Sequence, residues 1–203
     1  MGSAARRRAV HGATPQEAAL LLALGALLAV AATAAELQAV ETAGVNVPET
    51  LEVPGRTLRL NGSAVMKRMV FKVYVAALYL PEPTHDVSTV IAADEPKALV
   101  LHFQRAIPRQ SLVEAINNGL AANAPELAVR ARSEVEKLVA AVTDMKAGDR
   151  LEFVYLPGEG STVTMSGGPS VTLAGKDFAD AYLLLYLGPK PPRADLKKQL
   201  LGL

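Results

Sequence analysis

The chain has 203 residues, with 21 basic and 20 acidic side chains, a formal net charge of +1 and no cysteine. The absence of cysteine excludes disulfide bonds, thiol nucleophiles and cysteine-ligated metal sites. The balanced charge gives no electrostatic reason to expect a nucleic acid or an anionic membrane as a partner. The sequence has no Gly-rich phosphate-binding loop and no Gly-x-Ser-x-Gly nucleophile elbow, so it does not indicate a nucleotide-dependent enzyme or a serine hydrolase.

Residues 1–35 have the pattern of an export signal. Arg6 to Arg8 supply the positive start, an apolar run covers residues 18–32, and Ala32-Thr33-Ala34 is a small-x-small cleavage motif. The apolar run is about 15 residues long, shorter than the roughly 20 needed to span a bilayer as a helix. We therefore predict export to the periplasm and a mature chain that starts at Ala35 or Glu36, which N-terminal sequencing of the exported protein would test. The alternative is that the segment stays uncleaved and anchors the chain in a membrane. Only in that case does the sequence predict membrane attachment.

The next segment, residues 36–57, is short and contains a linker-like stretch from Ala43 to Pro54. Residues 58–66 and 70–80 then predict two consecutive strands, joined at Lys67-Arg68. Along residues 70–80, apolar side chains fall on both faces, which predicts a central strand that is covered on both sides. Prolines directly after this strand end it, because proline cannot donate to a strand ladder.

The rest of the chain alternates between helical and strand patterns. Residues 97–105 predict a strand whose Leu101 and Phe103 point into the core. Further elements are expected in this order: a helix at 87–93, a helix from Pro108 to Asn123, a second helix after Pro125, a hairpin of 149–156 and 161–166, a strand at 170–173, a helix around 178–186 and a helix at 194–201. Antiparallel-type strands with helices grouped between and after them predict an α+β fold, an antiparallel sheet covered by helices on one face.

Several sequence blocks resemble the bacterial chalcone isomerase-like family. They are FKVYVAALYL at 71–80, LVLHF at 99–103, NNGLAAN at 117–123 and GKDFADAYLLLYLGPKPPRADLKKQLLG at 175–202. The resemblance covers nearly all of residues 58–203, which we interpret as the domain. It implies the open-faced β-sandwich of that family, in agreement with the fold class inferred from periodicity.

The resemblance also implies where a site would lie. In plant chalcone isomerases an arginine stabilises an oxyanion, with help from a threonine and a tyrosine, and related fatty-acid-binding proteins hold a carboxylate with the arginine and a tyrosine. Laid over this chain without gaps, the arginine position falls on Met66, the threonine position on Tyr74, and the tyrosine position near Ser111 or Leu112. Methionine offers neither charge nor a hydrogen-bond donor. Catalysis of that type is therefore not expected.

Three further side chains are candidates for a ligand site. Tyr74 is the best candidate for a polar group facing a pocket, and the alternative is a core tyrosine whose hydroxyl binds the backbone. Lys72, expected on the same face as Tyr74, would replace the missing cation, or its ammonium would lie in solvent. Arg68 would replace it if a local slip in the strand turned its side chain inward.

Other residue patterns predict packing and not chemistry. Phe178, Tyr182 and Tyr186 recur at helical spacing, which favours core packing over a ligand-binding set. His85 and His102 are far apart and have no clustered carboxylates, so neither a metal site nor a cofactor is predicted.

The sequence thus predicts a non-catalytic protein that binds a small apolar or fatty-acid-like ligand. One alternative is an isomerase, an intramolecular lyase whose charge stabilisation has moved to Lys72 or Arg68. A second is an interaction protein whose core is filled and holds no ligand. A pocket of several hundred cubic ångströms that faces Tyr74 favours the first two, and a packed interior favours the third.

Overall fold

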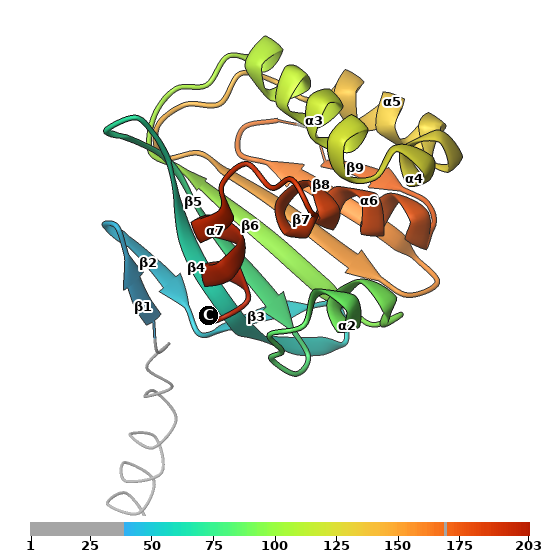
Figure 1. Ribbon diagram of the computed structural model, residues 1–203, viewed down its shortest axis with the longest axis horizontal. Coiled ribbons are helices and arrows are strands. Elements are labelled where there is room, and N and C mark those ends of the chain that lie inside the picture. Colours follow the sequence, from blue (N-terminus) through green and yellow to red (C-terminus); the bar gives the residue numbers. More distant parts are fainter. Residues whose placement is uncertain (1–38, 169) are drawn as a thin grey trace, which may run out of the picture. The chain divides into compact units, whose positions relative to one another are not determined.

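An antiparallel sheet forms the centre of the domain (Figure 1). The computed structural model describes residues 39–168 and 170–203. In the seven-stranded sheet, every strand lies beside its neighbour in sequence. The strands are β3 (Thr50–Val53), β4 (Arg56–Arg68), β5 (Phe71–Leu80), β6 (Lys97–Phe103), β7 (Arg150–Leu156), β8 (Gly160–Met165) and β9 (Ser170–Leu173). The sheet and its helices confirm the predicted α+β class.

The helices cover one face of this sheet. They are α2 (Val87–Ala92), α3 (Arg109–Asn123), α4 (Pro125–Arg130), α5 (Arg132–Ala141), α6 (Lys176–Leu187) and α7 (Ala194–Leu200). The side chains that they bury join one hydrophobic cluster with the strands. Helix α6 is apolar on most sides and is the most buried of them, as expected for a helix enclosed by other elements. Within the described ranges, no helix is long and apolar enough to cross a membrane.

The single helix expected after Pro125 is two helices in the structure. α4 ends at Arg130 and α5 begins at Arg132, and Ala131 between them has φ −97° and ψ 25°, outside the helical region. The side chain of Ala131 is nevertheless buried in the main core. The apolar positions on both sides of the break face the same core, so periodicity does not reveal it.

Residues 39–53 form strands, and the linker expected from Ala43 to Pro54 is a wrong interpretation. A hairpin of β1 (Ala39–Thr42) and β2 (Val45–Pro48) packs on the sheet face opposite the helices, with Val47 fully buried there. The Tyr79 hydroxyl donates a hydrogen bond of 3.0 Å to the Pro48 carbonyl oxygen. Prolines at the ends of these short strands gave the sequence the composition of a linker. The predicted export signal, residues 1–35, lies outside the described residues.

Strand β5 is buried on both faces, as its alternation predicts. One face joins the core below the helices and the other joins the smaller core below the β1–β2 hairpin: Ala76, Leu78 and Leu80 face the helices, and Val75, Ala77 and Tyr79 face the hairpin. On β6, Leu101 and Phe103 are 3% and 2% exposed, which confirms their predicted place in the core. The alternation of β5 and β6 therefore gives the correct faces along most of their length.

A lysine is buried at the start of β6. The Lys97 side chain is 1% exposed, and its ammonium donates to the carbonyl oxygens of Val90 at 2.5 Å and Ala93 at 2.7 Å. Burial, and secondarily the positive charge of Lys176, lower the pKa of Lys97 from 10.5 to about 8. Above about pH 8 the folded chain loses this proton while the unfolded chain still holds it. The unfolded state then binds more protons, so the free energy of unfolding rises with pH in this window.

We expect the loss of the Lys97 proton to raise the free energy of unfolding by about 1–2 kcal/mol as the pH increases from about 8 to about 10. Urea unfolding at a series of pH values measures this slope. The Lys97→Met variant is less stable at every pH, because two buried carbonyl groups lose their donor, and its slope in this window is flatter. If the free energy of unfolding rises equally with pH in the two proteins, Lys97 is not the group that titrates in this window.

Candidate functional site

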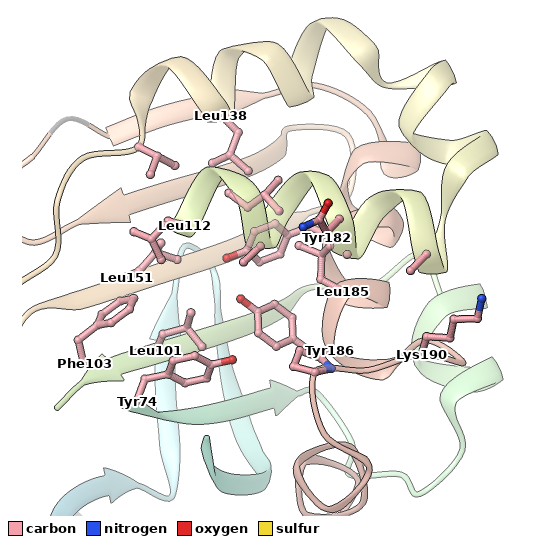
Figure 2. Close-up of a pocket in the computed structure, with 17 residues that line it drawn as sticks. Tyr74, Leu101, Phe103, Leu112, Leu138, Leu151, Tyr182, Leu185, Tyr186 and Lys190 are labelled. Atoms are coloured by element: carbon pink, nitrogen blue, oxygen red, sulfur yellow. The ribbon is translucent and has the colours of Figure 1, made fainter. Parts of the chain in front are cut away.

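An apolar cavity of about 340 Å³, here called the inner cavity, lies between the sheet, α3 and α6 (Figure 2). Its walls are mostly leucine, isoleucine, alanine and aromatic side chains. The principal lining residues are Tyr74, Leu101, Phe103 and Leu151 from the sheet, Leu112, Ala115, Ile116 and Gly119 from α3, and Tyr182, Leu185 and Tyr186 from α6. A space of this size and composition is typical of a site for a small apolar molecule.

The α3 wall follows from helical spacing. Leu112, Ile116 and Gly119 are four and three residues apart, so they lie on one side of the helix. The side chains of Leu112 and Ile116 are half-buried, because they border open space where a packed core would have neighbours. A Cβ at Gly119 would lie 2.7 Å from Cδ2 of Leu185. Glycine at this position therefore lets α3 approach α6 closely.

Three tyrosines line the inner cavity. Figure 2 shows Tyr74 from the sheet and Tyr182 and Tyr186 from α6 around the same space. Burial raises the pKa of all three hydroxyls, and proximity of Tyr74 and Tyr186 raises the pKa of Tyr74 further. The three side chains are thus neutral phenols at physiological pH, which act as hydrogen-bond donors or acceptors and not as phenolate bases.

The stripe of aromatic residues on α6 has two roles. Phe178 is buried in the core, and the Tyr182 ring stacks on Phe153 with ring centroids 4.4 Å apart. This is the core packing that the spacing predicts. Tyr182 and Tyr186 also line the inner cavity. Helical spacing cannot separate these roles, because a cavity wall and a packed core require the same apolar stripe.

A second cavity of about 560 Å³, here called the outer cavity, adjoins the first. The two share five lining residues: Tyr74, Phe103, Leu112, Ala115 and Pro192. The outer cavity is also lined by Met66, Arg68, Met69, Phe71 and Val73 of the β4–β5 hairpin, by Arg105, Ala106 and Ile107 after β6, and by Pro108 and Ser111 at the start of α3. An apolar inner cavity therefore adjoins a more polar outer one.

Two arginines lie in the wall of the outer cavity. Arg68 ends β4, and Arg105 follows β6, where its guanidinium lies 4.5 Å from the centroid of the Phe71 ring. Neither makes a salt bridge with an acidic residue in the part of the chain that the structure describes. The inner cavity has a charged side chain in its wall as well, Lys190, but Figure 2 shows its ammonium pointing away from the tyrosines.

A β-bulge separates Lys72 from the candidate site. Met66 pairs with Tyr74, but the next residue, Lys67, pairs with Lys72, so Val73 is an extra residue in β5. The alternation of faces is broken there. The Lys72 ammonium donates at 3.0 Å to the carbonyl oxygen of Ala43, in the hairpin on the opposite face of the sheet. The expectation that Lys72 shares the face of Tyr74 is therefore wrong, because the bulge shifts the pattern by one residue.

The other predicted positions come together. Met66 and Arg68 are two residues apart on β4, and both line the outer cavity with Tyr74, as do Ser111 and Leu112. Arg105 was not among the candidates, although it belongs to the same group. Its place beside the β4–β5 hairpin depends on the pairing of β5 with β6, which no local pattern around residue 105 reveals.

The chain belongs to the chalcone isomerase-like family, whose profile matches residues 39–202. Among solved structures, a fatty-acid-binding protein of Arabidopsis thaliana is similar, with a TM-score of 0.60 and 15% sequence identity. The match covers 81% of this chain and 96% of that one. No curated protein sequence matches the chain. The family and the fold agree with the resemblance drawn from the sequence.

No group of three or more histidine, aspartate and glutamate side chains that could hold a metal ion occurs among residues 39–168 and 170–203. His102 pairs with Arg150 across β6 and β7, and burial lowers the pKa of its imidazole. His85 lies in the loop before α2, where its Nδ1 is 2.5 Å from the carbonyl oxygen of Leu201. The two histidines take part in separate structural contacts.

Proposed function

We propose that this protein binds an amphiphile, without converting it. The apolar part of the ligand occupies the inner cavity, and an anionic head group lies in the outer cavity near Arg68 and Arg105. The observation that carries this proposal is that the two cavities adjoin and share five lining residues, with the arginines only in the outer one. The ligand class is a fatty acid or another chain with one acidic head group.

The composition of the inner cavity supports an apolar ligand. Its walls contain few polar atoms, and the hydroxyls of Tyr74, Tyr182 and Tyr186 remain neutral because burial raises their pKa. Neutral phenols accept a polar group of a ligand without the large cost of burying an unpaired charge. The similar plant structure is that of a fatty-acid-binding protein, and this likeness supports the same class of ligand.

The absence of an arginine at Met66 supports binding without catalysis. Met66 pairs with Tyr74 and lines the outer cavity, where it provides neither charge nor a hydrogen-bond donor. Loss of one oxyanion-stabilising group typically lowers a rate about 10²–10³-fold. We expect no cyclisation of a hydroxychalcone above the buffer rate, and stereoselective product well above that rate would favour the isomerase alternative, with Arg68 as the cation.

The proposal predicts that the outer arginines distinguish an acid from an alcohol. Arg68→Met and Arg105→Met each weaken binding of a long-chain fatty acid about three- to tenfold, a modest effect because both arginines are exposed to solvent. Binding of the alcohol of the same chain length changes less than twofold, measured by calorimetric titration. The matched control is Arg56→Met, at the other end of β4 and outside both cavities.

Equal losses of affinity for the acid and the alcohol would contradict a head-group role for these arginines.

The remaining alternative, an interaction protein with a filled core, is disfavoured by open space of about 340 Å³ beside Tyr74. Periplasmic export rests on residues 1–35 alone, and we retain it as part of the proposal.

A further inference from the structure

The turn between β4 and β5 exposes apolar side chains to solvent. Met69 is 87% exposed, Val70 83% and Phe71 53%. Val40, Val129 and Leu203 are the other large apolar side chains in the described residues with this degree of exposure, and they lie far apart in the sequence. Three consecutive exposed apolar residues at the end of a hairpin are unusual for a surface that contacts only water.

Basic residues surround this turn. Lys67 and Arg68 precede Met69, Lys72 follows Phe71, and the guanidinium of Arg105 lies over the Phe71 ring. None of these four cations makes a salt bridge with a carboxylate among the described residues. We call residues 67–72 together with Arg105 the basic tip. The near-zero net charge of the whole chain conceals this local concentration of positive charge.

The backbone of the turn is strained. Met69 has φ 55°, in the left-handed region that glycine and asparagine adopt with less strain. Tight two-residue hairpin turns normally use glycine, asparagine or aspartate at such a position. A large apolar side chain is thus placed, at an energetic disadvantage, where it has little contact with the rest of the protein. Strain of this kind points to a role for the side chain outside the fold.

The basic tip is continuous with the outer cavity. Arg68, Met69, Phe71 and Arg105 belong to both, whereas Val70 lies outside both cavities. Figure 1 shows the β4–β5 turn at an outer edge of the domain. A surface that the tip contacts would therefore lie beside the outer cavity.

We propose that the basic tip docks on an anionic phospholipid bilayer, with Met69, Val70 and Phe71 inserted among the acyl chains and Lys67, Arg68 and Arg105 at the phosphate level. This arrangement is the one that amphipathic surface anchors use, apolar side chains flanked by lysine and arginine. A second copy of the chain is a poorer occupant, because the tip presents only positive charge to its own copy. Docking does not require a bound ligand, but it gives the amphiphile proposed above a route between bilayer and cavity.

The test uses the purified protein with single tryptophans, since the chain has none of its own. Val70→Trp places the probe at the tip, and Val129→Trp places a matched probe at a similarly exposed position on α4. The N-terminal residues are the same in both proteins. Each is titrated with vesicles of phosphatidylcholine alone and of phosphatidylcholine mixed with phosphatidylglycerol.

The emission of Val70→Trp is expected to shift to the blue only with the anionic vesicles. The shift weakens as salt rises from about 0.1 M to about 1 M, where charges are screened beyond roughly 3 Å. Val129→Trp shows no shift. In co-sedimentation, Val70→Asp binds the anionic vesicles at least about tenfold more weakly than the unmodified protein, and its affinity for a fatty acid is unchanged because residue 70 lines neither cavity.

Three results would overturn the docking proposal. The emission of Val70→Trp does not shift with anionic vesicles, or the emission shifts equally at positions 70 and 129. The third is an emission shift that follows protein concentration without vesicles, which indicates self-association. Failure of the proposed function is distinguishable from these. In that case the emission of Val70→Trp still shifts with anionic vesicles, but neither the unmodified protein nor any variant binds a fatty acid.

Discussion

Replacement of Ala115 by tryptophan is expected to weaken binding of a fluorescent fatty acid at least about tenfold, which corresponds to about 1.4 kcal/mol. Ala115 is one of the residues shared by the inner and outer cavities, so an indole there occupies the passage that an amphiphile would follow. The side chain of Ala115 borders open space and is exposed, and the helix therefore accepts the larger residue without a steric conflict in the core. Fluorescence titration measures the affinity.

The control for this variant is Ala121→Trp. Ala121 is also exposed on α3, but it lines neither cavity. Its replacement should leave the affinity within twofold of that of the unmodified protein. Equal weakening by both variants would show that a change in helix α3 as a whole, and not closure of the passage, lowers the affinity.

Substitution of Gly62 by alanine is expected to lower the free energy of unfolding by on the order of 3 kcal/mol. Gly62 lies next to a register shift in β4, where α7 packs on the strand. A Cβ at this position would lie 2.1 Å from the Gln199 carbonyl oxygen and 2.8 Å from that of Leu200. Both atoms belong to the backbone, so the clash is relieved only by moving α7 away from the sheet.

Denaturant unfolding measures this effect, with Gly168→Ala as the control. A Cβ at Gly168 meets its nearest neighbours at 3.6 Å, an ordinary contact distance. The control should change the free energy of unfolding by less than about 1 kcal/mol. A similarly small effect of Gly62→Ala would mean that α7 is not held against β4 as closely as the structure has it.

The fold could be predicted from the sequence where local patterns and burial agree. In β6, and in β5 beyond Val73, side chains alternate regularly between the two faces, and Leu101 and Phe103 are buried as that alternation requires. Prediction failed where backbone irregularities interrupt a pattern. The bulge at Val73 places Lys72 on the opposite face from the one expected, and the break at Ala131 divides a helical pattern whose apolar side is continuous.

The candidate site could be predicted only in part. Resemblance to the family indicates Tyr74 and Met66, and both line the outer cavity, with Tyr74 also lining the inner one. The spacing of Tyr182 and Tyr186 on α6 predicts core packing only, because a cavity wall has the same periodicity as a packed core. Arg105 reaches the site through strand pairing between elements far apart in sequence, which no single-sequence pattern contains.

The most direct test of ligand binding is mass spectrometry of the small molecules that the protein retains. The purified protein is incubated with a total lipid extract, separated from free lipid by gel filtration and extracted with organic solvent, in parallel with Ala115→Trp. We expect an amphiphile with one acidic head group, retained by the unmodified protein and depleted from the variant. Retention of no such molecule by the unmodified protein, or equal amounts from both proteins, would contradict ligand binding in the two cavities.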